Sequence, residues 1–328
     1  MKIQNISTLI GAATAAVCVT LATTTAAQAQ VLGPNWTYTM DSLTDGHGEY
    51  NTVGAGSNYE MFGMAMKAQN GIISIAFNAN VALAGNSIGW AQDGNIGWGD
   101  VLFNFSGKSL KDASAAGQLF GIRFADTNDS GVAGTGVFSG VTAKNVAAEN
   151  SGFSTFSQYQ SVVGGTNVAA ANGSYTGQLG QIGYGGATVA EAKDYLTNVN
   201  GVSQDTSYGQ LNSIKTGTKV GDINFLGAAE IASLASGFAG LGGVGRTTVG
   251  FSFSQSLLGQ FMNPANAVIT LMEECTNDGM MLKATLPSTV PPAEQPVPEP
   301  ITMIGMALGG LGLVKGKMNQ RRAARVNA

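Results

Sequence analysis

The chain has 328 residues, of which 11% are charged and 47 are glycine, whereas about 25% of residues in a typical soluble domain are charged. This composition favours many short strands over long helices, and the length suits one large β domain between two terminal segments. The net charge of −4 conceals a more acidic central part of the sequence, because residues 30–298 contain 10 basic and 19 acidic residues and so carry −9. We therefore expect no nucleic-acid partner, since such binding needs a basic face.

Residues 1–29 have the pattern of a secretory signal peptide. Lys2 supplies the basic start, an apolar run follows over residues 9–22, and Ala27 and Ala29 form a small-x-small cleavage site. We expect the general secretory machinery to export the chain and signal peptidase to cut after Ala29.

The exported body, residues 30–286, is predicted to be mainly β. Its β-forming stretches are separated by turns rich in glycine and asparagine, and in Phe103-Asn-Phe105-Ser the aromatic and polar side chains alternate cleanly. A period of two places one set of side chains on each face of a sheet. We therefore predict an antiparallel β-sandwich-like body with one or two short helices. The predicted strands cover residues 36–40, 59–66, 72–77, 101–105, 119–124, 247–253 and 267–272.

One helix has a clear start and end in the sequence. Thr188 and Glu191 form a capping box, an apolar stripe follows, and Asn200-Gly201 ends it. Residues 225–238 are a second, weaker candidate. The small, polar residues 152–186 predict a long loop or insertion.

A candidate calcium loop lies at residues 126–131. Asp126, Asn128 and Ser130 place oxygen ligands at alternate positions before a glycine, as in the first half of an EF-hand. Val137 stands where an EF-hand has its bidentate glutamate, so an EF-hand is rejected. Two interpretations remain, a plain Asn/Asp turn and a weaker calcium site closed by a carboxylate from elsewhere.

Two tryptophans indicate a candidate glycan contact. Trp90 and Trp98 are eight residues apart, each near an aspartate and flanked by glycines. An exposed indole ring stacks on the apolar faces of sugars while carboxylates accept hydroxyl protons. The alternative for both is an ordinary place in the core or at a sheet edge.

The sequence gives little support to catalysis. His47 and Cys275 have no nucleophile-elbow pattern near them, and Glu273 and Glu274 are adjacent, so on a strand they point to opposite faces. Cys275 is the only cysteine after signal removal, which excludes an internal disulfide and a cysteine–histidine zinc cage. The glycine pattern at residues 240–245 precedes a strand, the wrong order for dinucleotide binding. We expect no enzyme activity and no cofactor beyond the weak calcium site.

The C-terminal segment combines a stalk, an apolar run and a basic tail. Residues 287–297 are a proline-rich stalk. The uncharged residues 301–314 would span about 21 Å as a helix, less than the roughly 30 Å of a bilayer core. The basic residues 315–328, with Arg321 and Arg322 among them, orient this end towards the cytoplasm. We expect a transient association with the inner membrane.

These features together carry a family resemblance. Pro298-Glu299-Pro300, the short apolar helix and Arg321-Arg322 resemble the PEP-CTERM sorting signal, over residues 298–328. The resemblance implies that an exosortase recognises and cuts the chain near Pro298-Glu299-Pro300, and that the body proceeds to the cell surface or beyond. Ile301 departs from the small residue common at that position, which leaves the cleavage point open.

The body is also similar to a family of exosortase-dependent surface proteins of cyanobacterial type. That family has no assigned chemistry, so the similarity implies location and not substrate. The stretches that carry it are Trp36-Thr-Tyr with Asp41-Ser, residues 59–65, 94–100, 103–106, 121–125 and 127–131, and Glu274-Cys-Thr-Asn277-Asp278.

These observations favour a non-enzymatic, exported cell-surface or extracellular-matrix protein in a Gram-negative-type envelope, processed by an exosortase. The alternative is a module that binds extracellular polysaccharide through the Trp90 and Trp98 segment. A secreted hydrolase has the least support.

Overall fold

The structure is a computed structural model that describes residues 32, 36–43, 45–163, 189–200, 202–203, 210–261 and 267–287. The chain divides into two units, residues 1–287 and 288–328, and every described residue belongs to the first. None of the described helices is long and apolar enough to cross a bilayer. The predicted signal peptide with Ala27 and Ala29, the stalk beyond Pro287 and the sorting signal lie outside the described residues.

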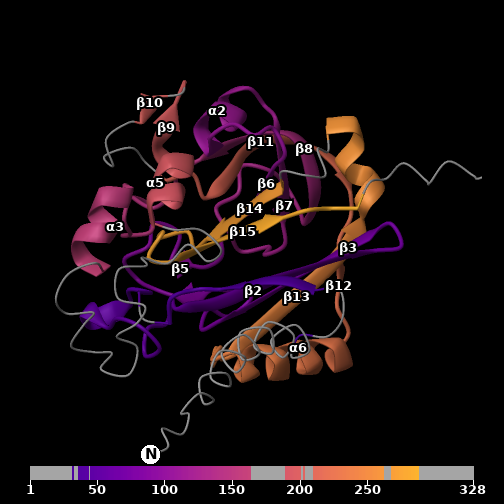
Figure 1. Ribbon diagram of the computed structural model, residues 1–328. Coiled ribbons are helices and arrows are strands. Elements are labelled where there is room, and N and C mark those ends of the chain that lie inside the picture. The colour runs from indigo at the N-terminus through magenta and orange to yellow at the C-terminus, as the bar shows by residue number, and fades with distance from the viewer. Residues whose placement is uncertain are drawn as a thin grey trace, which may run out of the picture. The chain divides into compact units, whose positions relative to one another are not determined.

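The body is built from two antiparallel sheets, as Figure 1 shows. The five-stranded sheet consists, in spatial order, of β1 (Trp36–Met40), β2 (Met61–Gln69), β3 (Ile72–Ala79), β13 (Thr247–Ser254) and β12 (Asn224–Phe225). The six-stranded sheet consists, in spatial order, of β11 (Ser213–Gly221), β8 (Gly136–Lys144), β7 (Leu119–Arg123), β6 (Val101–Asn104), β14 (Ala267–Met272) and β15 (Gly279–Ala284). Two minor ribbons pair β4 (Asn86–Ser87) with β5 (Asn95–Ile96) and β9 (Asn198–Val199) with β10 (Val202–Ser203). The prediction of a mainly β, sandwich-like body is confirmed.

The main core lies between the two sheets. Along β6, Val101 and Phe103 belong to this core while Leu102 faces the opposite side of the sheet. Because side chains alternate between the two faces of a sheet, each strand contributes every second side chain to the core between the sheets. Aromatic rings from both sheets meet there, and the ring centroids of Phe103 on β6 and Phe253 on β13 are 6.0 Å apart.

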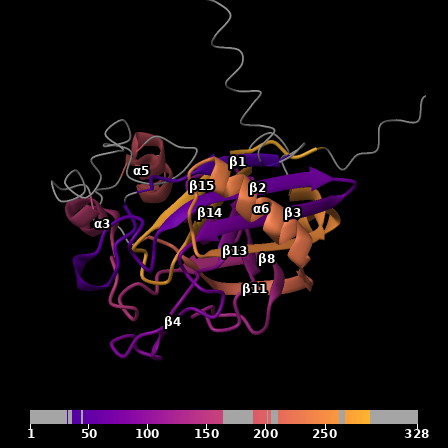
Figure 2. The ribbon, with the colours of Figure 1, turned by 90° about the horizontal axis from the view of Figure 1, so that it is seen from below.

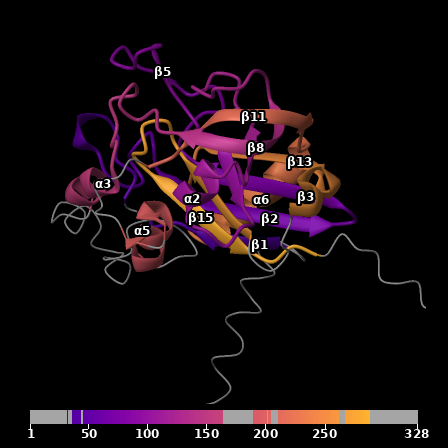
Figure 3. The same ribbon diagram turned by 90° about the horizontal axis from the view of Figure 1, so that it is seen from above.

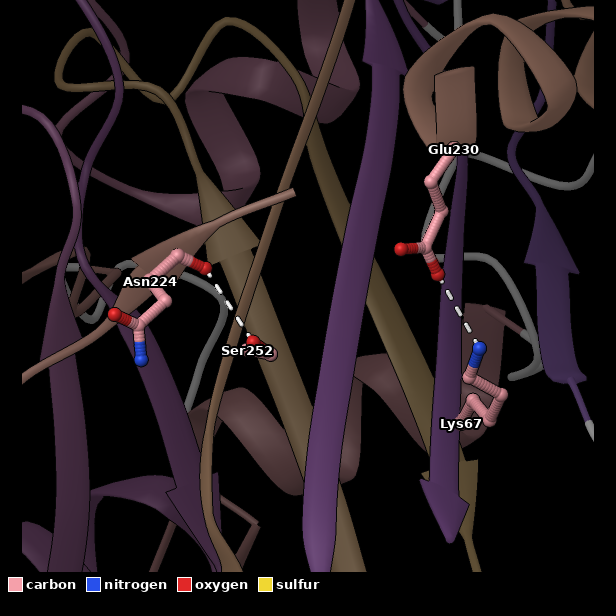
Figure 4. Close-up of polar contacts among 4 residues, drawn as sticks. All are labelled: Lys67, Asn224, Glu230 and Ser252. Carbon is pink, nitrogen blue, oxygen red and sulfur yellow. Dashed lines mark hydrogen bonds and ion pairs between the residues drawn. The ribbon is translucent and has the colours of Figure 1, made fainter. Parts of the chain in front are cut away.

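Helix α6 (Ala228–Gly240) covers the outer face of the five-stranded sheet (Figure 2). Leu234 and Phe238 are buried there. An ion pair between Lys67 Nζ and Glu230 Oε1, 3.2 Å apart, joins the helix to β2, and Ser252 Oγ donates to the Asn224 carbonyl nearby (Figure 4).

The outer face of the six-stranded sheet is covered by three helices, α2 (Leu110–Ala115), α3 (Phe156–Val163) and α5 (Val189–Thr197). Figure 3 shows α3 and α5 together at one end of this body. Leu110, Phe156 and Leu196 form a second core with the side chains of that sheet face. Two 3-10 segments, Glu49–Asn51 and Gln255–Phe261, complete the described elements.

The predicted helices are confirmed within a few residues, but part of the predicted loop 152–186 is wrong. Residues 156–163 form α3, because Phe156, Tyr159 and Val163 share one helical face and bury it against the sheet. The hydroxyl of Thr155 accepts from the Gln158 amide at 3.2 Å and caps its start. The rest of the predicted loop beyond residue 163 lies outside the described part.

Candidate functional site

Five acidic side chains are buried together where strands of both sheets begin or end. Their exposed fractions are 0–2%, although acidic residues are almost never fully buried unless they are paired. We call this group the carboxylate cluster: Asp41, Asp45, Glu60, Glu273 and Asp278.

Antiparallel pairing brings these residues together. Asp41 follows β1 and Glu60 precedes β2, and these two positions lie at the same edge because Met40 pairs with Gly63. Glu273 and Asp278 occupy the turn between β14 and β15. The turn is fastened to β2 because the Met61 amide donates to Asp278 Oδ2 at 2.7 Å.

The centre of the cluster is compact. One carboxylate oxygen from each of Asp41, Asp45 and Asp278 lies within 4.8 Å of the other two. Glu60 approaches the same place, because a Cβ atom on Gly46 would lie 2.6 Å from Glu60 Oε2 and 2.9 Å from Asp278 Oδ2. A side chain at position 46 would therefore collide with the cluster.

Backbone amides hold one oxygen of several of these groups. Asp41 Oδ1 accepts from the amide of Ser42 at 2.9 Å, and Glu60 Oε2 accepts from that of Gly46 at 2.8 Å. The Asp278 amide donates to Glu273 Oε2 at 2.9 Å. These bonds fix the orientation of each carboxyl group.

The second oxygen of the same three groups has no hydrogen-bond partner in the described part of the protein. Asp41 Oδ2, Glu60 Oε1 and Glu273 Oε1 are all buried without one. A buried polar atom left unsatisfied costs about 1–3 kcal/mol, and more if it is charged. Three such atoms in one group require an explanation.

The electrostatics of the cluster are unfavourable to charge. Burial raises the pKa of Asp41 well above its ordinary value, and the neighbouring Asp45 and Glu60 raise it further. The pKa values of Glu60, Glu273 and Asp278 are raised for the same two reasons, first burial and then the nearby acidic groups. The bare protein therefore favours protonated carboxyl groups here.

The cluster offers chemistry of one kind. All its donor atoms are carboxylate oxygens, the ligands that hard cations such as Ca²⁺ prefer. Among the residues the structure describes, three members of the cluster, Asp41, Asp45 and Asp278, lie close enough together to hold a metal.

The predicted calcium loop at residues 126–131 is arranged around a side-chain cation. Arg123 Nε donates to Asn128 Oδ1 at 2.9 Å, and its guanidinium also donates to the carbonyls of Asp126 and Val132. Asn128 Nδ2 donates in turn to Asp100 Oδ1 at 2.8 Å. Asn128 Oδ1 is thus already engaged by Arg123, and calcium at Asp126, Asn128 and Ser130 stays a prediction.

The two tryptophans of the predicted glycan contact lie in different environments. Trp90 is 56% exposed, whereas Trp98 is fully buried and its Nε1 donates to the Ala82 carbonyl at 3.0 Å. The expectation of an exposed ring is corrected at Trp98, because its ring packs against Phe77 and Phe124 in the main core. Glycan contact by Trp90 stays a prediction.

The remaining sequence candidates, His47 and Cys275, lie near members of the cluster in the chain. The ring of His47 packs on that of Phe153, and Cys275 is a buried free thiol. Glu273 and Glu274 diverge as expected, since Glu274 accepts from the amides of Gly97 and Asp129, away from the cluster. Burial raises the pKa of Glu274 to about 8.

A surface hollow of 440 Å³ lies elsewhere, over β14, β15 and α5. Tyr195, Lys108 and Lys283 line it. Asn104 donates to the Tyr195 hydroxyl at 3.2 Å, and Lys283 pairs with Glu191. Two of these lining side chains, Tyr195 and Lys283, are therefore already engaged in polar contacts.

Sequence reasoning did not find the carboxylate cluster. A usable signal was present in a chain with few charges. Asp41 directly follows the predicted strand at residues 36–40, Glu60 lies at the start of the next one, and Glu273 and Asp278 come just after the one at residues 267–272. Which of these ends meet depends on strand pairing.

Comparison of the chain with protein families, with curated proteins and with solved structures finds no match.

Proposed function

We propose that this protein is an exported, non-enzymatic component of the cell surface or extracellular matrix, sorted by an exosortase at its C-terminus. The observation that carries the proposal is the sequence of features at the C-terminus: Pro298-Glu299-Pro300, then an uncharged run at residues 301–314, then Arg321-Arg322. Residues 1–29 add the pattern of an export signal. The inner membrane and the exosortase are its transient partners on this route.

The end of the folded body supports this division. Leu286 is 2% exposed, and Gln255 Nε2 donates to the Pro287 carbonyl at 2.7 Å, so the body is packed up to the first residue of the predicted stalk. A processing enzyme that cuts after residue 297 would leave these contacts intact. The sandwich-like body would then reach its destination folded.

Mass spectrometry of the C-terminal peptide from protein recovered outside the cell tests the sorting proposal. We expect a peptide that ends near Pro298-Glu299-Pro300 and lacks Arg321 and Arg322. Glu299→Ala should leave the tail attached and the protein with the membranes, while Glu294→Ala, the same change in the stalk, should not. Extracellular protein that retains Arg321 would contradict the proposal.

A second function, binding to extracellular polysaccharide, is favoured by the exposure of Trp90. Ser151 Oγ donates to the Trp90 carbonyl at 3.1 Å, which holds the backbone beneath the ring. Trp90→Ala should reduce retention on the organism's own polysaccharide several-fold. Tyr50→Ala, which removes a ring that is 91% exposed, serves as the matched control. Equal retention of both variants and the wild type would exclude this function.

A further inference from the structure

Four members of the carboxylate cluster, Asp41, Glu60, Glu273 and Asp278, lack a positively charged partner in the described part of the protein. Leaving Asp45 aside, no lysine or arginine among the described residues forms an ion pair with a member of the cluster. Buried charges in proteins are paired, bound to metal or neutralised by protons. The cluster must therefore hold either protons or a cation.

The unsatisfied oxygens favour a cation. A protonated carboxyl group needs an acceptor for its proton just as a carboxylate needs a donor. Asp41 Oδ2, Glu60 Oε1 and Glu273 Oε1 have no hydrogen-bond partner, while the other oxygen of each group is held by a backbone amide. In each of these three groups, one oxygen is held by the backbone and the other is unpartnered, which is the arrangement expected of a carboxylate that binds a metal.

We propose that the carboxylate cluster binds one Ca²⁺ ion, with Asp41, Asp45 and Asp278 as its central ligands. Two oxygens that bind one calcium ion at 2.3–2.6 Å lie no more than about 5 Å apart. The oxygens of these three residues, all within 4.8 Å of one another, satisfy that limit. Glu60 and Glu273 lie close enough to add further negative charge at the same site.

The donor set and the burial together select calcium. Zinc prefers nitrogen and sulfur ligands, whereas all five groups here supply oxygen. Magnesium keeps several of its water molecules, which a site whose residues are 0–2% exposed does not accommodate easily. Calcium takes 6–8 oxygens in flexible geometry and tolerates several carboxylates.

The ion would join parts of the body that are far apart in the chain. Asp41 directly follows β1 and Asp45 lies in the same loop, while Asp278 precedes β15 of the other sheet. Calcium would thus fasten the edge of one sheet to the edge of the other. The site belongs to the folded body and does not depend on the sorting proposal.

The first test is calcium-dependent stability of the full chain. The purified protein is stripped with chelator and its Tm followed as Ca²⁺ is added. We expect a saturable rise of about 5–10 °C at a hundredfold excess over Kd, with one equivalent bound by calorimetry. Magnesium and zinc chloride at the same concentrations should give a smaller rise.

Asp41→Asn separates binding from folding. The variant keeps the acceptor for the Ser42 amide and replaces the unsatisfied oxygen by a neutral group of the same shape. We expect its Tm in chelator to equal or exceed that of the wild type, because the amide is neutral in this buried site without having to take up a proton. Its calcium affinity should fall at least tenfold.

Asp126→Asn is the matched control, because it makes the same change in the other candidate calcium loop. We expect its response to calcium to equal that of the wild type. Loss of the response in Asp126→Asn with retention in Asp41→Asn would move the site to that loop and overturn the proposal.

Terbium luminescence gives an independent test of where the ion binds. Tyr159 donates its hydroxyl to Asp45 Oδ2 at 3.0 Å, so its ring lies beside the proposed ion. Bound Tb³⁺ should luminesce when tyrosine is excited, and Tyr159→Phe should reduce that luminescence. Added Ca²⁺ should displace the Tb³⁺ and abolish the luminescence of the wild type. A wild-type protein with the same Tm in chelator and in saturating calcium, and no terbium signal, would show that the cluster holds protons instead.

Discussion

The Met61 amide donates to the Asp278 carboxylate at 2.7 Å across a sequence separation of 217 residues. This bond joins the start of β2 to the start of β15, so it links the two sheets at their edges. Loss of this bond would leave a buried amide without a hydrogen-bond partner. The carboxylate cluster is thus part of the framework of the body as well as a candidate site.

Gly46→Ala should destabilise the protein by about 1–3 kcal/mol, because the added methyl group overpacks the cluster. Its Cβ would lie 2.5 Å from Glu60 Cα, a backbone atom that cannot swing aside. Gly89→Ala is the control, since no atom lies within 4 Å of its Cβ position. Denaturant unfolding measures both, and equal stability of the two variants would contradict the packing described.

Trp98→Ala should cost about 3–5 kcal/mol, the usual range for truncating a buried aromatic side chain, because the ring is fully buried against Phe77 and Phe124. Trp90→Ala, with a ring that is 56% exposed, should change the free energy of unfolding by less than about 0.5 kcal/mol. Chemical denaturation followed by circular dichroism compares them. A comparable cost for both would mean that Trp90 is also buried in solution.

Arg123→Lys should loosen the loop at residues 126–132, because an ammonium group cannot make the spread of hydrogen bonds that the guanidinium makes to Asn128, Asp126 and Val132. Hydrogen exchange of the loop amides should accelerate at least tenfold. Strand β3 supplies the internal reference, since its exchange should not change. Unchanged loop protection would show that Arg123 does not organise this segment.

Asp100 should make the free energy of unfolding depend on pH in a way that the variant Asp100→Asn does not. Burial raises the pKa of Asp100 above its ordinary value, despite hydrogen bonds from Ile214 and Asn128 that lower it. Above about pH 3.9 the carboxyl group loses its proton in the unfolded state but still holds it in the folded state. The stabilisation that Asp100 contributes therefore falls as pH rises from about 3.9 through the pKa of Asp100 in the folded protein.

The measurement is the free energy of unfolding of the wild type minus that of Asp100→Asn, determined from about pH 4 to 7. The difference should decline as pH rises, because only the wild type titrates at this position. A difference that increases with pH would mean that hydrogen bonds outweigh burial and that the pKa of Asp100 is lowered.

Local patterns explain how much of the fold was predictable. The strand at residues 267–272 and the helix after Thr188 were predicted because alternation, capping and helical stripes are recorded in neighbouring residues. Strands β8 and β11 were not, since Gly136–Lys144 and Ser213–Gly221 mix small, polar and charged residues, and their pairing has irregular register. Pairing between strands stabilises them more than local preference does.

The sequence alone determined the β-rich class of the body, and it supports proposals for export and sorting that rest on the ends of the chain. Only the tertiary structure decided that Trp98 is buried and that Asp41, Asp45 and Asp278 converge. The reason is physical. Periodicity records which face of a strand is buried, whereas the convergence of these residues depends on hydrogen bonds between segments more than 200 residues apart.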